Sequence, residues 1–136
     1  MANSDNVIRA GLTPKLRDVP NLVSGLTYSA SPPSKHVVDP RPFATSAASM
    51  FYDPPIPEFS VVRTILPDKN EKHQEKHRAV GGPSLVIVTE GSGIVSWGIA
   101  QTLLIGRGDV FFVGANIGLE FESKETLVMF RAFVES

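Results

Sequence analysis

Two groups of side chains in this sequence have the types and spacing that could carry chemistry. The first group lies near the start of the chain, where "SDNVIRAGLTPK" places Asp5, Arg9 and Lys15 within eleven positions. Arginine offers a planar fork of donors suited to phosphate or to a pair of oxygens, and lysine adds a point charge. These residues indicate either an anion site or ordinary exposed and ion-paired charges, and their spacing alone favours the second interpretation.

The position of Arg9 bears on this choice. If residues 7–12 form a strand, the apolar side chains share one face, and Arg9 lies on the other face beside Gly11, where no side chain crowds a ligand. Asp5 is on the same face but ~13 Å away at ~3.3 Å per residue, so a straight strand leaves Arg9 without a local partner. The inward residues of this strand would be Ile8, Ala10 and Leu12.

The second group is the set of three histidines, His36, His73 and His77. His73 and His77 are four residues apart and could hold a metal on one helix face. Their context, "NEKHQEKHR", is a charged run without an apolar stripe, which favours a surface loop, and His36 is expected at the surface too. The chain has no cysteine and no H-x-H or H-E-x-x-H pattern, so we expect it to bind no metal itself.

Composition limits the possible classes of protein. A chain of 136 residues with 42% apolar and 20% charged residues is typical of one soluble domain with a hydrophobic core. The net charge of −1 gives no overall field that would recruit nucleic acid or an acidic membrane, and no window approaches the ~20 apolar residues of a membrane helix. The lack of cysteine favours a reducing, cytosolic setting.

The elements that must position the first group begin with a short helix. Asp18 can cap it, Pro20 fits its first turn and Gly25 can end it, which predicts about two turns between residues 18 and 26. Residues 29–57 are rich in proline and serine, which predicts a long irregular segment that wraps over a core. Its apolar side chains would dock it: Val37, Val38, Phe43, Met50, Phe51 and Tyr52.

The remainder, from Phe59 onward, predicts short strands separated by glycine, asparagine or charged turns. The sequence "GRGD" at 106–109 is expected to be a hairpin turn, and residues 67–78 a charged connection. The pattern around residues 90–115 resembles half of a cupin, so the predicted fold is mostly β: a cupin-like jelly roll, as half-barrel or sandwich, with the short helix and the irregular segment. The predicted strands are 59–66, 84–91, 93–97, 101–106, 109–114, 118–122 and 126–135.

The opening segment, "SDNVIRAGLTPKLRDVPNLVSGLTY", resembles the signature segment of type I phosphomannose isomerases, the zinc-dependent mannose-6-phosphate isomerases. The blocks "YDPPIPEFSV", "GDVFFVGAN" and "FRAF" are similar to the C-terminal cupin half of that family. Family members are considerably longer, so the resemblance is to their C-terminal portion only.

This resemblance implies an enzyme that interconverts mannose 6-phosphate and fructose 6-phosphate through a cis-enediol, on the route to GDP-mannose. Arg9 would be the active-site arginine that stabilises the enediolate, because arginine does not release its proton as a base must. Lys15 and Asp5 would contact or orient the phosphosugar. Zinc would be a Lewis acid of the full-length, monomeric parent, with ligands upstream of this chain. The isolated chain would then be inactive.

The resemblance also divides the chain into parts. Residues 1–28 would complete an upstream domain with the active-site strand and the short helix, residues 29–58 would wrap, and residues 59–136 would form the C-terminal cupin-like domain. Two alternatives remain: a non-catalytic jelly-roll module that binds sugar or a partner protein, and a purely structural domain. A sugar-binding module predicts phosphosugar binding that does not depend on metal.

Overall fold

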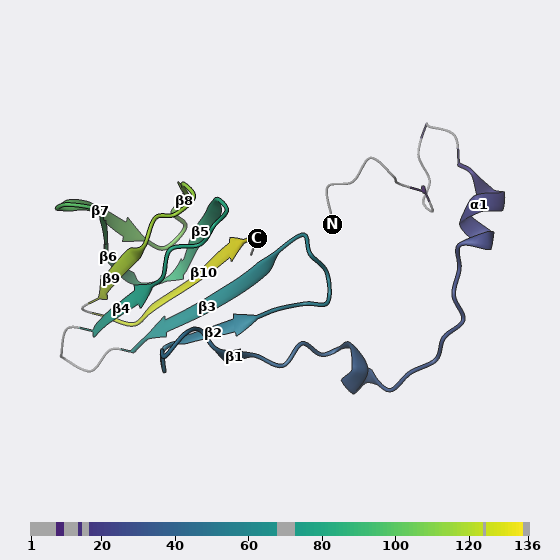
Figure 1. The fold of residues 1–136 in the computed structure, drawn as a ribbon, viewed down its shortest axis with the longest axis horizontal. Coiled ribbons are helices and arrows are strands. Elements are labelled where there is room, and N and C mark those ends of the chain that lie inside the picture. The colour runs from purple at the N-terminus through teal and green to yellow at the C-terminus, as the bar shows by residue number, and fades with distance from the viewer. Residues whose placement is uncertain (1–7, 10–13, 15–16, 68–72, 124, 135–136) are drawn as a thin grey trace. The chain divides into compact units, whose positions relative to one another are not determined.

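The computed structural model describes residues 8–9, 14, 17–67, 73–123 and 125–134, and the chain divides into two units, Met1–Val37 and Val38–Ser136. The first unit contains helix α1 (Val19–Ser24) and a short 3₁₀ helix, η1 (Pro33–His36) (Figure 1). Asp18 caps α1 by accepting a hydrogen bond from the Asn21 amide at 3.2 Å, and Gly25 follows the last turn. The predicted helix is therefore confirmed. No helix in the described ranges is long and apolar enough to cross a membrane.

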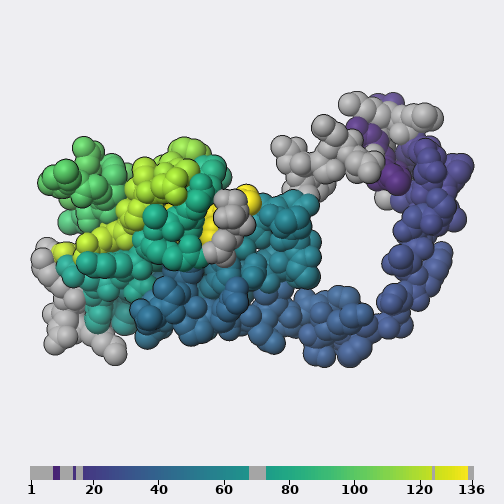
Figure 2. Space-filling model, in the orientation of Figure 1, coloured from purple at the N-terminus to yellow at the C-terminus, as the bar shows by residue number. Residues whose placement is uncertain are grey.

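The second unit consists of two antiparallel sheets. Its residues form one continuous mass in the space-filling view (Figure 2). The six-stranded sheet has the order β1-β2-β3-β10-β5-β8, and the four-stranded sheet has the order β4-β9-β6-β7 (Figure 1). The strands are β1 (Arg41–Pro42), β2 (Ser49–Tyr52), β3 (Ser60–Leu66), β4 (His73–His77), β5 (Ser84–Glu90), β6 (Ser92–Trp97), β7 (Gln101–Gly106), β8 (Val110–Val113), β9 (Leu119–Ser123) and β10 (Leu127–Phe133).

The mostly β fold predicted from the sequence is confirmed, and β3 and β5 to β10 fall within a few residues of the predicted strands. These strands were predictable because buried and less buried residues alternate along them. In β10, for example, every second residue is buried and the others are half-buried. The core between the sheets is made by ten buried apolar residues: Leu66, Val86, Val88, Val95, Ile105, Val113, Leu119, Phe121, Leu127 and Met129.

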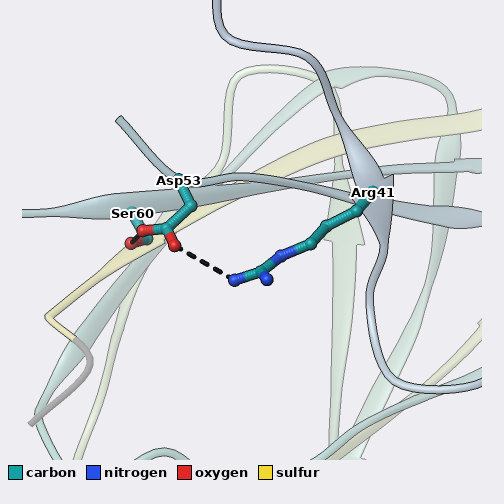
Figure 3. A network of polar contacts seen from close by, with 3 residues as sticks. All are labelled: Arg41, Asp53 and Ser60. Carbon is teal, nitrogen blue, oxygen red and sulfur yellow. Dashed lines mark hydrogen bonds and ion pairs between the residues drawn. The ribbon is translucent and has the colours of Figure 1, made fainter. Parts of the chain in front are cut away.

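Of the apolar residues predicted to dock the Pro/Ser-rich segment, Phe43 and Phe51 join a second buried cluster with Val62, Val80 and Phe133. Val37 is instead 62% exposed, so the docking predicted for it is wrong. Its two short strands, β1 and β2, were not predicted. β1 lies at the edge of the sheet, where Arg41 pairs with Asp53 at 3.0 Å, and Ser60 donates a hydrogen bond to the same carboxylate (Figure 3). The edge position explains why a strand containing Pro42 is tolerated, since its missing N–H faces no partner strand.

The "GRGD" stretch is a tight turn but not a hairpin, so that part of the prediction is wrong. The Asp109 amide donates to the Gly106 carbonyl at 3.0 Å, and the Asp109 carboxylate accepts from the Gly106 amide at 2.8 Å. Gly108 adopts φ 94°, a conformation that favours glycine. The turn carries the chain from β7 in one sheet to β8 in the other, which closes the sandwich instead of pairing two neighbours.

Candidate functional site

The predicted substrate site is only partly within the described residues. Arg9 is half-buried, and neither Arg9 nor Ile8 belongs to a strand. Ile8 is 46% exposed, so the inward packing predicted for it is not seen in this chain. Asp5 and Lys15 lie outside the described ranges, as do most residues of the strand predicted for 7–12. The structure therefore does not test whether these three side chains come together.

The interpretation of the histidine pair as a surface loop is wrong. His73 to His77 form strand β4, which pairs with β9 along its whole length. Its inward positions are occupied by Glu75 and His77, which are 9% and 2% exposed. No apolar alternation reveals this strand in the sequence, because the residues that face the interior are themselves polar. His36, in contrast, is exposed as expected, and its Nε2 lies 2.7 Å from the Ser31 hydroxyl.

A buried polar network surrounds His77. The Ser49 hydroxyl donates to Glu75 Oε1 at 2.6 Å and lies 3.2 Å from His77 Nε2. The Thr64 hydroxyl lies 2.9 Å from the same nitrogen and 2.8 Å from the Ser49 hydroxyl. Ser49 and Thr64 belong to the six-stranded sheet, whereas Glu75 and His77 belong to the other. The network therefore joins the two sheets through the interior, where each polar group needs a partner.

Two buried side chains in this region, His77 and Arg131, have lowered pKa values. Burial, together with the charge of Arg131, lowers the pKa of His77 to about 3, so its imidazole is neutral near pH 7. Burial and the neighbouring Arg78 lower the pKa of Arg131 to about 10. The Arg131 guanidinium donates from Nε to the Ser84 hydroxyl at 2.9 Å and from Nη1 to the Arg78 carbonyl at 3.4 Å. These hydrogen bonds hold the side chain between strands, which indicates a structural role.

An open groove of about 640 Å³ lies beside β4, β9 and the turn that joins β6 to β7. A pair between Lys76 Nζ and Glu120 Oε1, 3.5 Å apart, lies on its wall, and Trp97 and Gln101 contribute an indole and an amide. The groove can hold a polar molecule. Its residues are Ala44, Lys76, His77, Arg78, Ser96, Trp97, Gly98, Ala100, Gln101, Gly118, Leu119 and Glu120.

Metal ligation has a simple requirement, since zinc in proteins takes three or four ligands from histidine, cysteine and carboxylate side chains. In the described part of the chain, no group of three or more such residues is placed to hold an ion. Glu75 and His77 bind hydroxyl groups of their own chain instead. The described residues therefore do not fit a zinc centre.

Two antiparallel sheets that close over one core place the second unit in the class of cupin-like jelly rolls. Residues 49–99 match the family model of the phosphomannose isomerase type I C-terminal region. The chain as a whole is 52% identical over 137 residues to the mannose-6-phosphate isomerase of Cryptococcus neoformans and covers 31% of that protein. It is 45% identical over 142 residues to the mannose-6-phosphate isomerase of Ogataea parapolymorpha and covers 33% of it.

Solved structures agree with these relatives. A mutant phosphomannose isomerase from Salmonella typhimurium has 26% sequence identity and a TM-score of 0.74, with 99% of this chain and 33% of that chain covered. The mannose 6-phosphate isomerase of the same organism, bound to substrate and zinc, has 24% identity and a TM-score of 0.71, which shows the fold alone.

These matches confirm the resemblance predicted from the opening motif. The chain is similar to a C-terminal portion of type I phosphomannose isomerases. It spans about a third of the length of the curated relatives that it matches.

Proposed function

We propose that this chain forms the C-terminal part of an aldose–ketose isomerase that interconverts mannose 6-phosphate and fructose 6-phosphate through a cis-enediol. The observation that carries the proposal is its alignment with a mannose-6-phosphate isomerase at 52% identity over 100% of the chain. The aligned range includes positions 5, 9 and 15, where the predicted substrate residues lie.

In this proposal Arg9 stabilises the negative charge that develops on the two oxygens of the enediolate. Its planar fork can donate to both oxygens at once, and an arginine side chain does not release its proton as a base must. Lys15 binds the phosphate or takes part in the proton transfer, and Asp5 orients a neighbouring polar group.

Zinc, when bound in such an enzyme, polarises the sugar oxygens as a Lewis acid. Because the described residues do not fit a zinc centre, its ligands would come from the part of the enzyme for which this chain has no counterpart. This chain's contribution to the reaction is to hold the substrate and its developing charge. It follows that the 136-residue chain alone is inactive.

A chimera tests the proposal directly. The aligned 31% of the Cryptococcus neoformans enzyme is replaced by this chain, and conversion of mannose 6-phosphate is assayed with and without a zinc chelator. We expect zinc-dependent turnover by the chimera and none by the 136-residue chain with added zinc. A folded chimera without turnover would contradict the proposal, as would turnover by the isolated chain. Phosphosugar binding that the chelator leaves unchanged would favour a non-catalytic module.

The role of Arg9 is tested in the same chimera. We expect Arg9→Ala to lower kcat/KM on the order of 10²-fold or more, because it removes donors aimed at the developing oxyanion. Stability should change much less than the rate, by about 1 kcal/mol or less, because Arg9 is only half-buried. Arg9→Lys should recover part of the rate, since it keeps the charge but loses the fork. If Arg9→Ala unfolds the chimera while the folded fraction turns over normally, Arg9 is a structural residue.

A further inference from the structure

The outer face of the six-stranded sheet is apolar, although nothing in the described residues of the second unit covers it. Side chains alternate across each strand, so the residues opposite the buried ones point outward. The most exposed of these outward residues are Leu85 at 53%, Ile87 at 43%, Val110 at 60% and Phe112 at 70%. Phe130, half-buried on β10, lies next to Ile87 in the register of the sheet. The apolar side chains thus form one continuous patch.

A sheet with one face in water normally alternates apolar and polar residues, whereas continuous apolar runs are typical of strands buried on both faces. The runs "LVIV" in β5 and "VFFV" in β8 are of the second type. Apolar patches of this kind on a monomer mark interaction sites. We therefore regard the face as one that is buried in the working protein.

One charged residue lies within this face. Arg63, on β3, is the only charged side chain at the outward positions of β2, β3, β10, β8 and of β5 up to Thr89. Its guanidinium lies 5.9 Å from the ring centre of Tyr52, and its Nε is buried without a hydrogen-bond partner in the described residues. When a partner covers this face, the Nε–H group of Arg63 loses its remaining access to water and then needs a hydrogen-bond acceptor. The partner that covers this face should therefore bring a carboxylate or carbonyl oxygen to Arg63.

The face also has a hollow suited to an apolar side chain. It measures about 270 Å³ and is lined by Phe59, Leu85, Phe112 and Val134, among others. It lies at one end of the patch, next to the edge strand β8. A partner can therefore insert a large apolar residue there while its polar group meets Arg63.

We propose that the outer face of the six-stranded sheet is the docking surface for the body of a mannose-6-phosphate isomerase, meaning the two thirds of such an enzyme that have no counterpart in this chain. This inference rests on the proposed function. The length of the relatives supports it, because the chain covers only 31–33% of them. A partner of that size can cover a whole sheet face, as a short peptide could not.

A second copy of this chain fits the face less well. Two copies related by a two-fold axis would present the same patch to each other. The outward positions of β2, β3, β10 and β8 hold no carboxylate, so a second copy offers Arg63 no carboxylate from these strands. A different partner can supply one.

The absence of cysteine from this chain allows a direct test with single thiols. Phe112→Cys places a thiol on the apolar face, and Leu104→Cys places one on the outer face of the four-stranded sheet. The two positions are matched: Phe112 is 70% and Leu104 is 77% exposed, and each lies on an edge strand of its sheet. Each variant is made in the 136-residue chain and in the chimera. Labelling by a thiol reagent is followed by mass spectrometry of the peptide that carries the new thiol.

In the chimera we expect position 112 to be labelled at least ~10-fold more slowly than position 104, since thiol reactivity depends on access. In the 136-residue chain we expect similar rates at both positions. Similar rates in an active chimera would overturn the docking proposal. If position 112 of the isolated chain is labelled more slowly at higher protein concentration, a second copy of the chain covers the face. That result would also overturn the docking proposal.

The two proposals can fail separately. A chimera that lacks isomerase activity but protects position 112 would refute the proposed function and leave the docking surface standing. An active chimera in which position 112 is labelled as fast as position 104 would support the proposed function and refute the docking surface.

Discussion

The two sheets of the second unit differ in the polarity of their outer faces. The outer face of the six-stranded sheet is apolar apart from Arg63, Glu90 at the end of β5 and a few hydroxyl groups, as at Tyr52 and Thr89. The four-stranded sheet has a largely polar outer face, with charged residues at Lys76, Glu120 and Glu122. It also turns Glu75 and His77 inward, so its polar residues occupy both faces of β4.

The difference lies in where each sheet finds its partners. Two inward polar groups of the four-stranded sheet, the Glu75 carboxylate and His77 Nε2, find partners within this chain in Ser49 and Thr64 of the opposite sheet. His77 Nδ1 and the Ser123 hydroxyl are buried without a hydrogen-bond partner in the described residues. The outer face of the four-stranded sheet meets water. The six-stranded sheet instead presents to water the kind of surface that proteins bury. A contiguous apolar surface of this kind marks an interaction site.

The largest effect we expect comes from a charge placed on the apolar face. In the chimera, Ile87→Asp should lower the free energy of unfolding by about 3 kcal/mol, because it buries an unpaired carboxylate in the docked interface. Leu104→Asp, on the outer face of the other sheet, should change it by no more than ~0.5 kcal/mol. Urea unfolding of both variants measures this contrast. Equal losses would remove the distinction between the two outer faces.

The next effect concerns the inward polar residues. The pKa of His77 in the folded chain, about 3, lies below the unfolded value of 6.5. The unfolded state therefore binds the extra proton as the pH falls, and stability that is fully present above pH 6.5 is lost between 6.5 and 3. We expect a loss on the order of 2 kcal/mol at pH 5 from this residue alone.

Urea unfolding at pH 7.5 and pH 5 measures that loss. His77→Gln should remove this part of the pH dependence, because the variant has no group that titrates there. His36→Gln, which replaces an exposed histidine, controls for the loss of a histidine in general. A wild-type profile that is flat between these two pH values would mean that His77 is not held neutral by its surroundings.

The strands predicted correctly from the sequence are those whose signals lie within the strand itself and the turns beside it. β5 to β10 have short apolar runs bounded by turn residues, and glycine marks the change of sheet after β7. The helix was predicted because its capping residues, Asp18 and Gly25, lie next to it. These signals need no knowledge of the rest of the fold.

The features that the sequence did not reveal depend on distant partners. β4 faces inward with Glu75 and His77, and the hydroxyl groups that make this possible come from Ser49 and Thr64, 26 and 13 residues away. Arg9 was singled out from a motif, but the residues that would surround a substrate are not in the described ranges. The apolar runs of β5 and β8 indicate burial on two sides without saying what lies on the second side.

The smallest effect we expect is at the other edge of the six-stranded sheet, where Arg41 of β1 pairs with Asp53 (Figure 3). The two side chains are 65% and 48% exposed, so water screens their attraction. Arg41→Gln should therefore lower the free energy of unfolding by no more than ~0.5 kcal/mol, and the part due to charge should shrink further in salt. Asp53 keeps a second partner in the Ser60 hydroxyl at 3.0 Å, which holds the carboxylate in place without Arg41.

Urea unfolding of Arg41→Gln, Asp53→Asn and the double variant gives the coupling between the two residues. A coupling well above ~1 kcal/mol would mean that this edge is shielded from solvent in the chimera.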